Sequence, residues 1–408
     1  MTRRRHQLKL AAVLAALLLL GCANSLGRAW ALSEAPASPK GWVVWSDYRN
    51  QAGTGVDIRG YDLTMGKELI LCDAPGDQDG PVVSGDWVAW QDLRNVRGTG
   101  VDIRARGLPT GKELSVCDAP GDQTFPAISG DWLVWGEWPT TWQQTGWDVY
   151  ASNLRTGKQV TVCNAPGGQS THTVSGDWIV WEDLRHKSVT GSDIYGYDLR
   201  MGKEVIVCAT QGDQWHPAVS GDWVVWDDWR NAERTGGDIY AYDLRAGKEI
   251  LICAAPADQY GPVIAGNWVV WDDWRSREKT GRDIYAYDLR ARTEVVVCDA
   301  PGDQFWPIIS GDWVVWRDRR RGMTSGSDIY ARNLQTGEEV SISHDPGSGS
   351  DVRLAISDEL VVWEDWRNLA STGVDIYAFD LRARRETSIC TAPGTQQAPA
   401  IWAQRLGP

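Results

Sequence analysis

Short β-prone runs separated by turn residues recur along the chain. One copy contains the runs Pro217–Ser220, Trp223–Trp226, Asp238–Leu244 and Glu249–Cys253, joined by a Gly-Asp turn, a polar loop and an Ala-Gly turn. Helical repeats would show apolar residues three and four apart over a dozen positions, whereas these runs are four to seven residues long. Successive strand residues point to opposite sheet faces, so the unbroken apolar run Trp223–Trp226 needs cover on both. The pattern predicts four-stranded sheets that stack face to face.

A tryptophan at the end of the second run marks each copy of this unit. It recurs at intervals of 45 to 47 residues, a period typical of propeller blades. The eight positions are Trp45, Trp90, Trp135, Trp181, Trp226, Trp271, Trp316 and Trp363. We therefore predict an all-β fold, an eight-bladed β-propeller of four-stranded antiparallel blades over residues 41–408.

The two ends of the repeat region complement each other. The chain enters the repeats at Gly41-Trp42, in a second run, and leaves at Ala398–Ile401, which matches a first run such as Pro126–Ile128. We expect the C-terminal strand to complete the N-terminal blade. Such closure removes the sheet edges that would invite aggregation.

The first 22 residues differ in kind from the repeats. Basic residues between Arg3 and Lys9 precede the apolar run Leu10–Leu20, which is too short to span a bilayer. Residues 1–22 are therefore expected to be a signal peptide. The Ala/Ser/Pro-rich residues 23–40 would form a tether.

The leader ends in Leu-Leu-Gly-Cys, which resembles the bacterial lipobox and predicts that Cys22 is diacylated. Ordinary cleavage after Ala31 is the alternative. We expect an exported cell-envelope lipoprotein, in the periplasm or on the outer cell surface, or a secreted protein if cleavage follows Ala31. A membrane contact is expected through the lipid anchor only.

Composition narrows the range of partners. The chain holds 25 Trp but only 3 Phe, as copying of one motif would produce, and its formal net charge is −13. Such a charge repels phosphate backbones, so nucleic acid is not an expected partner. We expect a monomer whose partner is a surface or periplasmic protein, or a glycan.

The run Ser220–Trp223 together with Asp238–Leu244 resembles the TolB-like propeller repeat, in the variant found in tandem in archaeal and bacterial surface proteins. The resemblance covers nearly all of residues 41–402. It implies the propeller fold but is nearly silent on activity, because family members bind proteins while related propellers accompany peptidases or act as polysaccharide lyases. The chain has no Gly-x-Ser-x-Gly hydrolase motif.

Seven cysteines occupy one place in the last run of their repeats. They are Cys72, Cys117, Cys163, Cys208, Cys253, Cys298 and Cys390, with Ser343 in the seventh repeat. Equivalent sites on stacked sheets lie about 10 Å apart, too far for a disulfide. We interpret them as packing residues; a redox or metal role is the alternative.

Charged residues also recur around the loop after the second run. Asp228, Arg230 and Asp238 are spaced so that the arginine can clamp a carboxylate across one hairpin. The alternative is a ring of catalytic carboxylates or cation ligands. The third repeat departs from the pattern, with Glu137 and Pro139 in place of Asp and Arg.

Positions that vary between repeats offer the better candidates for a ligand site. Each first run starts where the chain reaches the expected mouth of a central channel, and its variable residues mix aromatic and polar groups suited to a sugar or peptide. The predicted ligand-binding residues are Phe125, His172, Trp215, His216, Tyr260, Phe305, Trp306 and Arg353. Alternatively, these side chains only plug the channel or pack between blades.

Further tryptophans are expected on the same face. Trp138, Trp142 and Trp147 in the third repeat suit a carbohydrate or protein contact surface. For the equivalent loop tryptophans of other repeats, packing over the arginines is the favoured interpretation. His172 and His216 are offset by one residue in the alignment, so we predict no metal site and no cofactor.

Three hypotheses follow. The first is a non-catalytic envelope protein, tethered through Cys22, that binds a surface protein or a glycan. The second is a propeller enzyme, a polysaccharide lyase or hydrolase, with its site at the channel mouth. The third is a purely structural spacer in the cell coat.

Overall fold

The computed structural model describes residues 39–139, 146–322, 326–344 and 352–405, and these contain strands and turns but no helix. Accordingly, no described segment is a helix of the length and apolarity that crossing a membrane requires. Residues Pro39–Gln404 form one compact unit. The signal peptide, the tether and Cys22 lie outside the described residues.

The strands form eight four-stranded antiparallel sheets, or blades, and within each blade every strand pairs with the one that follows it. Blade 1 consists of β32 (Gln396–Gln404), β1 (Lys40–Asp47), β2 (Asp57–Asp62) and β3 (Lys67–Cys72). Blade 2 consists of β4 (Gln78–Ser84), β5 (Trp87–Asp92), β6 (Asp102–Gly107) and β7 (Glu113–Cys117). Blade 3 consists of β8 (Gly121–Ser129), β9 (Trp132–Pro139), β10 (Asp148–Asn153) and β11 (Gln159–Cys163). Blade 4 consists of β12 (Gln169–Ser175), β13 (Trp178–Asp183), β14 (Asp193–Asp198) and β15 (Lys203–Cys208).

The second half repeats the arrangement. Blade 5 consists of β16 (Gln214–Ser220), β17 (Trp223–Asp228), β18 (Asp238–Asp243) and β19 (Lys248–Cys253). Blade 6 consists of β20 (Gln259–Ala265), β21 (Trp268–Asp273), β22 (Asp283–Asp288) and β23 (Thr293–Cys298). Blade 7 consists of β24 (Gln304–Ser310), β25 (Trp313–Asp318), β26 (Asp328–Asn333) and β27 (Glu339–Ser343). Blade 8 consists of β28 (Leu354–Ser357), β29 (Leu360–Asp365), β30 (Asp375–Asp380) and β31 (Arg385–Cys390).

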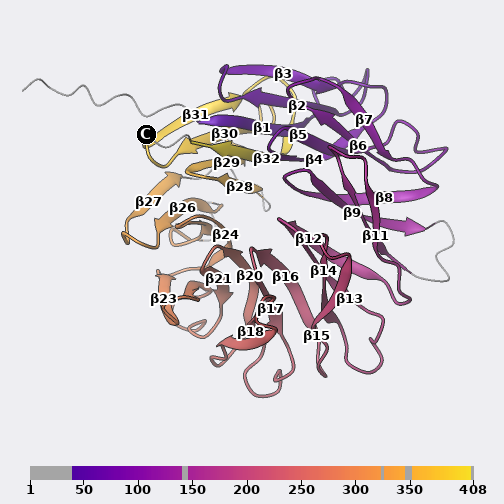
Figure 1. Ribbon diagram of the computed structural model, residues 1–408. Coiled ribbons are helices and arrows are strands. Elements are labelled where there is room, and N and C mark those ends of the chain that lie inside the picture. The colour runs from indigo at the N-terminus through magenta and orange to yellow at the C-terminus, as the bar shows by residue number, and fades with distance from the viewer. Residues whose placement is uncertain (1–38, 140–145, 323–325, 345–351, 406–408) are drawn as a thin grey trace, which may run out of the picture. The chain divides into compact units, whose positions relative to one another are not determined.

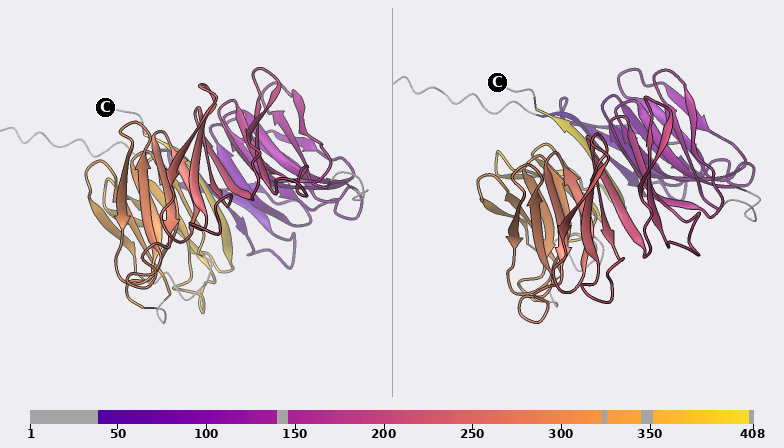
Figure 2. Two further views of the ribbon diagram at one scale, coloured as in Figure 1. Left: turned by 90° about the horizontal axis from the view of Figure 1, so that it is seen from below. Right: turned by 60° about the horizontal axis from the view of Figure 1, so that its bottom comes forward.

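The first strands form a closed inner ring. Each contacts the first strand of the next blade from β4 through β28, and β32 contacts both β28 and β4 (Figure 1). Strand β32 pairs antiparallel with β1, with Trp42 opposite Trp402. The eight-bladed propeller closed by its C-terminal strand is therefore confirmed. The blades are stacked face to face around the ring (Figure 2).

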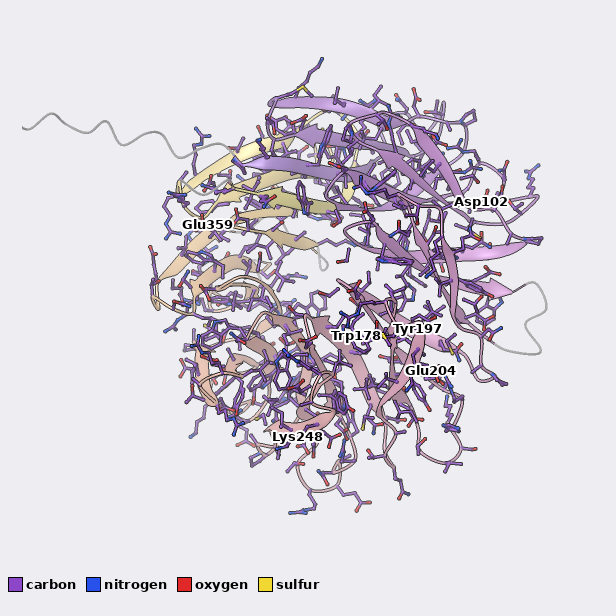
Figure 3. The ribbon with its side chains drawn as sticks, viewed as in Figure 1. Asp102, Trp178, Tyr197, Glu204, Lys248 and Glu359 are labelled. Carbon is purple, nitrogen blue, oxygen red and sulfur yellow. The ribbon has the colours of Figure 1, made fainter. Side chains whose placement is uncertain are left out.

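The core lies between blades, as the unbroken apolar runs predict. Val224 packs against blade 4 and Val225 against blade 6, and both are fully buried. Trp226 is also fully buried and stacks on Tyr240 of the neighbouring strand, with ring centroids 6.0 Å apart. Side chains fill the spaces between neighbouring sheets (Figure 3).

The recurring charges form a clamp within the hairpin of every blade except blade 3. Asp228 accepts hydrogen bonds from Trp226 Nε1 at 2.9 Å and from the guanidinium of Arg230 at 2.6 and 2.8 Å. Arg230 also lies 4.2 Å over the Tyr240 ring and 3.1 Å from Cys208 Sγ. The repeat cysteines are free thiols, and burial raises the pKa of Cys208 to about 12. These contacts support the structural interpretation of both patterns.

Blade 3 departs from this clamp, as its sequence indicates. Glu137 occupies the place of the clamping aspartate, and Trp135 Nε1 has no hydrogen-bond partner among the described residues. Burial raises the pKa of Glu137, with a smaller contribution from the charge of Asp148. Pro139 stands at the position of the clamping arginine, so blade 3 lacks the Asp-Arg pair of the other blades.

Candidate functional site at the channel mouth

A bulge near the start of the first strands builds the channel wall. In most blades, pairing with the second strand shifts register just after the residue that follows a recurring glutamine, as between Trp215 and Ala218 in blade 5. The residue at the third position then has a left-handed backbone, a conformation that side chains other than glycine rarely adopt. The φ angles are 60° for Gly80, 56° for Phe125, 47° for Thr171, 54° for His216, 59° for Gly261, 55° for Trp306 and 53° for Ala398.

In several blades the bulge also makes a hydrogen bond to the preceding blade. The backbone N–H of His216 donates to Glu182 at 2.8 Å, and that of Trp306 donates to Asp272 at 3.0 Å. Both acceptors directly follow the buried tryptophan of a second strand. The residue that directly follows this tryptophan was not singled out from the sequence, although its variability among the repeats was a usable signal. From blade 1 to blade 8 this position holds Ser46, Gln91, Gly136, Glu182, Asp227, Asp272, Arg317 and Glu364.

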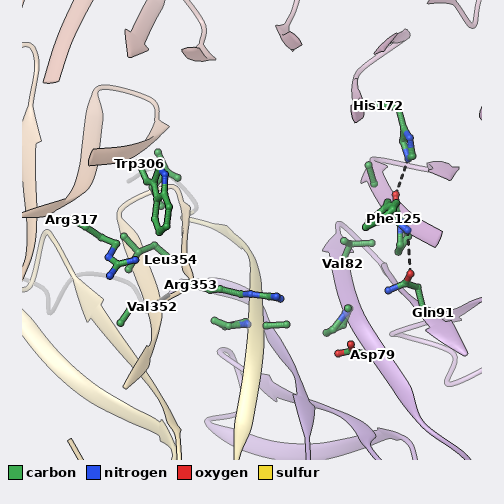
Figure 4. A pocket seen from close by; sticks show the side chains of 17 residues that line it. Asp79, Val82, Gln91, Phe125, His172, Trp306, Arg317, Val352, Arg353 and Leu354 are labelled. Carbon is green, nitrogen blue, oxygen red and sulfur yellow. Dashed lines mark hydrogen bonds between the residues drawn. The ribbon is translucent and has the colours of Figure 1, made fainter. Parts of the chain in front are cut away.

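A cavity of about 890 Å³ opens at the channel mouth between blades 7, 8, 1, 2, 3 and 4. Phe125 and His172 lie on one side of it, and Trp306 and Arg353 on the other (Figure 4). Phe125 and Trp306 are 66% and 49% exposed. These large apolar groups therefore line the cavity without being buried in it.

Positive charge exceeds negative charge on the cavity wall. Arg353 is exposed and has no ion-pair partner among the described residues. Arg317 is buried, donates from Nε to Ser327 Oγ at 2.8 Å, and lies 5.0 Å from the Trp306 ring. Asp79 is the one acidic residue of the lining, and it accepts a hydrogen bond from Ser46 Oγ at 2.7 Å. The wall can thus attract an anionic group.

His172 contributes a neutral imidazole to the wall. Its Nε2 lies 2.7 Å from the backbone oxygen of Phe125. Enclosure within the channel wall lowers the pKa of His172 to about 4, against the opposing effect of that hydrogen bond. At neutral pH, Nε2 therefore carries the proton that it donates to Phe125, which leaves Nδ1 as an acceptor.

An aromatic path leads from the end of β9 in blade 3 to the cavity. The rings of Trp138 and Trp147 meet edge to face at 5.2 Å, and Trp147 lies 5.7 Å from Phe125. A second cavity, of about 480 Å³, lies between Phe125, Trp147 and His172. The predicted contact surface and channel mouth therefore adjoin; Trp142, the third predicted contact residue, lies outside the described residues.

The remaining candidates lie away from the cavity lining. Phe305 is 5% exposed and packs 5.0 Å from the Arg317 guanidinium, so it is a core residue. Trp215 packs on Trp229, with ring centroids 5.7 Å apart. His216 and Tyr260 contact each other on the part of the wall formed by blades 5 and 6. Of the eight predicted residues, Phe125, His172, Trp306 and Arg353 share the cavity.

Of the equivalent loop tryptophans of other blades, Trp274 packs over arginines. Trp274 lies 4.6 Å from the guanidinium groups of both Arg277 and Arg282. Trp229 instead donates from Nε1 to Asp227 at 2.9 Å. Within the described ranges, no three His, Cys, Asp or Glu side chains are grouped so that they could hold a metal ion.

Comparisons with known proteins identify the fold alone. No protein-family model and no curated protein sequence matches the chain. Apo AztD from Citrobacter koseri is 13% identical, with a TM-score of 0.54 over 89% of this chain and 98% of AztD. A prolyl endopeptidase is 13% identical, with a TM-score of 0.55 over 82% of this chain and 54% of the peptidase. TolB from Acinetobacter baumannii is 14% identical, with a TM-score of 0.42 over 85% of this chain and 78% of TolB. The chain is thus a β-propeller that shares its architecture with proteins of different activities.

Proposed function

We propose that this propeller is a non-catalytic binding protein of the cell envelope that holds a glycan at the mouth of its central channel. The aromatic path Trp138–Trp147–Phe125, which ends at the cavity opposite Trp306, carries the proposal. Sugar rings present apolar faces that stack on aromatic side chains, while their hydroxyls remain hydrogen-bonded.

The backbone of the two cavity aromatics supports a binding role. Phe125 and Trp306 adopt left-handed conformations at a position where three other blades have glycine or alanine, namely Gly80, Gly261 and Ala398. An exposed aromatic side chain in a strained backbone contributes little to folding, and such strain is concentrated at functional sites. A side chain that merely plugged the channel would be buried, whereas Phe125 is 66% exposed.

The positive charge of Arg353 indicates that the ligand carries a negative charge. Its guanidinium is exposed on the wall and lacks an ion pair among the described residues. Arginine binds carboxylate and sulfate groups through paired hydrogen bonds. We therefore favour a glycan with an acidic sugar near Arg353 over a neutral one.

The envelope location and the repeat family are further parts of the proposal. Export and lipidation at Cys22 rest on the leader sequence, and membership of the TolB-like repeat family rests on motifs such as Ser220–Trp223. Mass spectrometry of the mature N-terminus should find a diacylated Cys22. An unmodified N-terminus would reject the lipoprotein.

A binding screen tests the function directly. Residues 41–408 are titrated with neutral and acidic cell-wall and plant glycans, with tryptophan fluorescence and calorimetry as readouts and chromatography of the sugars in parallel. We expect saturable binding of an acidic glycan without new products. Product release would instead support the propeller enzyme, and silence across the panel would reject glycan binding in favour of a protein partner.

A further inference from the structure

Blades 5 and 6 carry a hydrogen-bonded chain of three side chains on the channel wall. His216 Nδ1 lies 2.7 Å from Asp227 Oδ1, and His216 Nε2 lies 3.1 Å from Tyr260 Oη. The two rings meet edge to face at 4.5 Å. His216 occupies the left-handed position that Phe125 and Trp306 occupy in their blades, so it belongs to the same wall.

Asp227 is held in place from several directions. It is fully buried, and it accepts hydrogen bonds from Trp229 Nε1 at 2.9 Å and from the Gly261 backbone at 3.1 Å. Because Asp227 is an acceptor, it requires the proton of His216 on Nδ1. The other nitrogen, Nε2, then faces Tyr260 in every protonation state.

This arrangement links the polarity of Tyr260 to the charge of His216. When His216 is neutral, Nε2 accepts the phenol proton of Tyr260, and Oη offers only lone pairs to a ligand. When His216 is protonated, Nε2–H donates to Oη, and the phenol O–H is released toward the channel. Tyr260 is 36% exposed, so its hydroxyl can reach a ligand.

The surrounding charges favour the protonated state. Burial lowers the pKa of His216, but the hydrogen bond and charge of Asp227, together with the charge of Glu182, raise it overall. Around Tyr260, burial and the charges of Asp227, Asp272 and Glu182 raise the pKa of the phenol against the effect of Arg282. Tyr260 therefore remains a neutral donor, and the nearby carboxylates disfavour an anionic ligand.

The constellation occurs only once among the blades that the structure describes. The position of His216 is taken elsewhere by Gly80, Phe125, Thr171, Gly261, Trp306, Arg353 and Ala398. The position of Tyr260 is taken by Asp79, Thr124, Ser170, Trp215, Phe305, Val352 and Gln397. A network that the fold required would recur in every blade, so this one is not needed to build the propeller.

We propose that Tyr260, positioned by His216 and Asp227, is a second ligand subsite, which donates a hydrogen bond to an acceptor-only oxygen of a neutral sugar unit. The ring oxygen, the glycosidic oxygen and the N-acetyl carbonyl are such acceptors. The class of ligand in this inference rests on the proposed glycan function. The inference adds that glycan affinity depends on pH. Binding at this subsite is tightest while His216 is protonated.

The first test examines the hydrogen-bonded chain Asp227–His216–Tyr260 in the full propeller without ligand, by carbon-13 NMR of the histidine rings across pH. Replacement Asp227→Asn should lower the pKa of His216 by about one unit, because the carboxylate charge is lost. Tyr260→Phe should change the His216 titration far less, and Tyr242→Phe, a tyrosine substitution away from the channel, should leave it unchanged. If Asp227→Asn leaves the pKa of His216 unchanged, the proposed coupling between Asp227, His216 and Tyr260 is wrong.

The second test uses chitotetraose and cellotetraose, two neutral probes, by calorimetry and NMR at about pH 5.5 and about pH 8, on either side of the ordinary histidine pKa. We expect at least one probe to shift the His216 signal and to bind about threefold to tenfold more tightly at the lower pH. Tyr260→Phe should abolish this difference while Tyr242→Phe retains it. If neither probe shifts His216 while acidic-glycan binding through Trp306 persists, the subsite is rejected and the proposed function stands.

Discussion

Phe125 is a left-handed residue at the channel mouth whose effect on stability can be measured separately from its effect on glycan binding. Phe125→Gly relieves the strained backbone and removes an exposed ring, so the free energy of unfolding should stay constant or rise by up to about 1 kcal/mol. Glycan affinity should fall in the same variant. Urea denaturation measures the first effect. Phe305→Gly is the matched control, because this phenylalanine is buried and should cost about 3 to 5 kcal/mol. Equal destabilisation by the two variants would contradict the assignment.

A buried carboxyl in the wall makes stability depend on pH. Burial raises the pKa of Asp272 to about 7, opposed by Arg282 and by the hydrogen bond from the Trp306 backbone. The folded protein therefore binds this proton more tightly than the unfolded chain, whose aspartates titrate near pH 3.9. Stability from this group is full below about pH 4 and is lost as pH rises toward about 7, by up to about 1.4 kcal/mol per pH unit. Asp272→Asn should flatten the dependence in melts between these values, and an unchanged slope would assign it elsewhere.

The contrast between Phe125 and Phe305 also shows what the sequence could not predict. Both lie near the start of a first run, and alignment offers both as channel residues. Counted from the recurring glutamine, Phe125 is the third residue of its run and lies on the wall, whereas Phe305 is the second residue of its run and lies in the core, because a shift of one residue in a strand exchanges its two faces. The alternation of short runs predicts strands but not this local change of register.

At the scale of the element, the clamp holds the hairpin together in the blades that carry the Asp-Arg pair. Asp228→Ala leaves the buried Trp226 Nε1 and the Arg230 guanidinium without their acceptor, so we expect a loss of about 3 to 5 kcal/mol. Glu137→Ala is the control, because blade 3 lacks the clamp and the loss should be well below that of Asp228→Ala. Thermal denaturation of both variants measures the difference. Similar melting temperatures would refute the structural role of the clamp.

The strands themselves could be predicted because each blade repeats the same pattern of apolar runs and turn residues. Trp223–Trp226 is apolar on both faces, and each face is covered by a neighbouring blade. The pairing of His216 with Asp227 and Tyr260 could not be predicted in this way. It joins a bulged residue to the next blade, and that contact depends on the curvature of the ring rather than on spacing along the chain.

At the scale of the whole molecule, β32 closes the ring. Deletion of residues 391–408 should expose the edge of β1 and the contacts of β32 with β4 and β28, and it should lower the melting temperature or cause association. Removal of the residues after Gln404 is the control, because it retains β32. Calorimetry and size-exclusion chromatography compare the two. A deletion that melts like the control would disprove closure by the C-terminal strand.

The measurement that tests the central claim most directly is a calorimetric titration of the best acidic glycan into the propeller and into the double variant Phe125→Ala/Trp306→Ala. The two rings lie on opposite sides of the cavity and are exposed, so their removal should weaken binding by about tenfold or more without unfolding the protein. Trp274→Ala, a loop tryptophan outside the cavity lining, should bind like the unmodified protein. Loss of affinity confined to the double variant is the predicted result. Equal affinity in all three proteins would contradict a glycan site at the channel mouth.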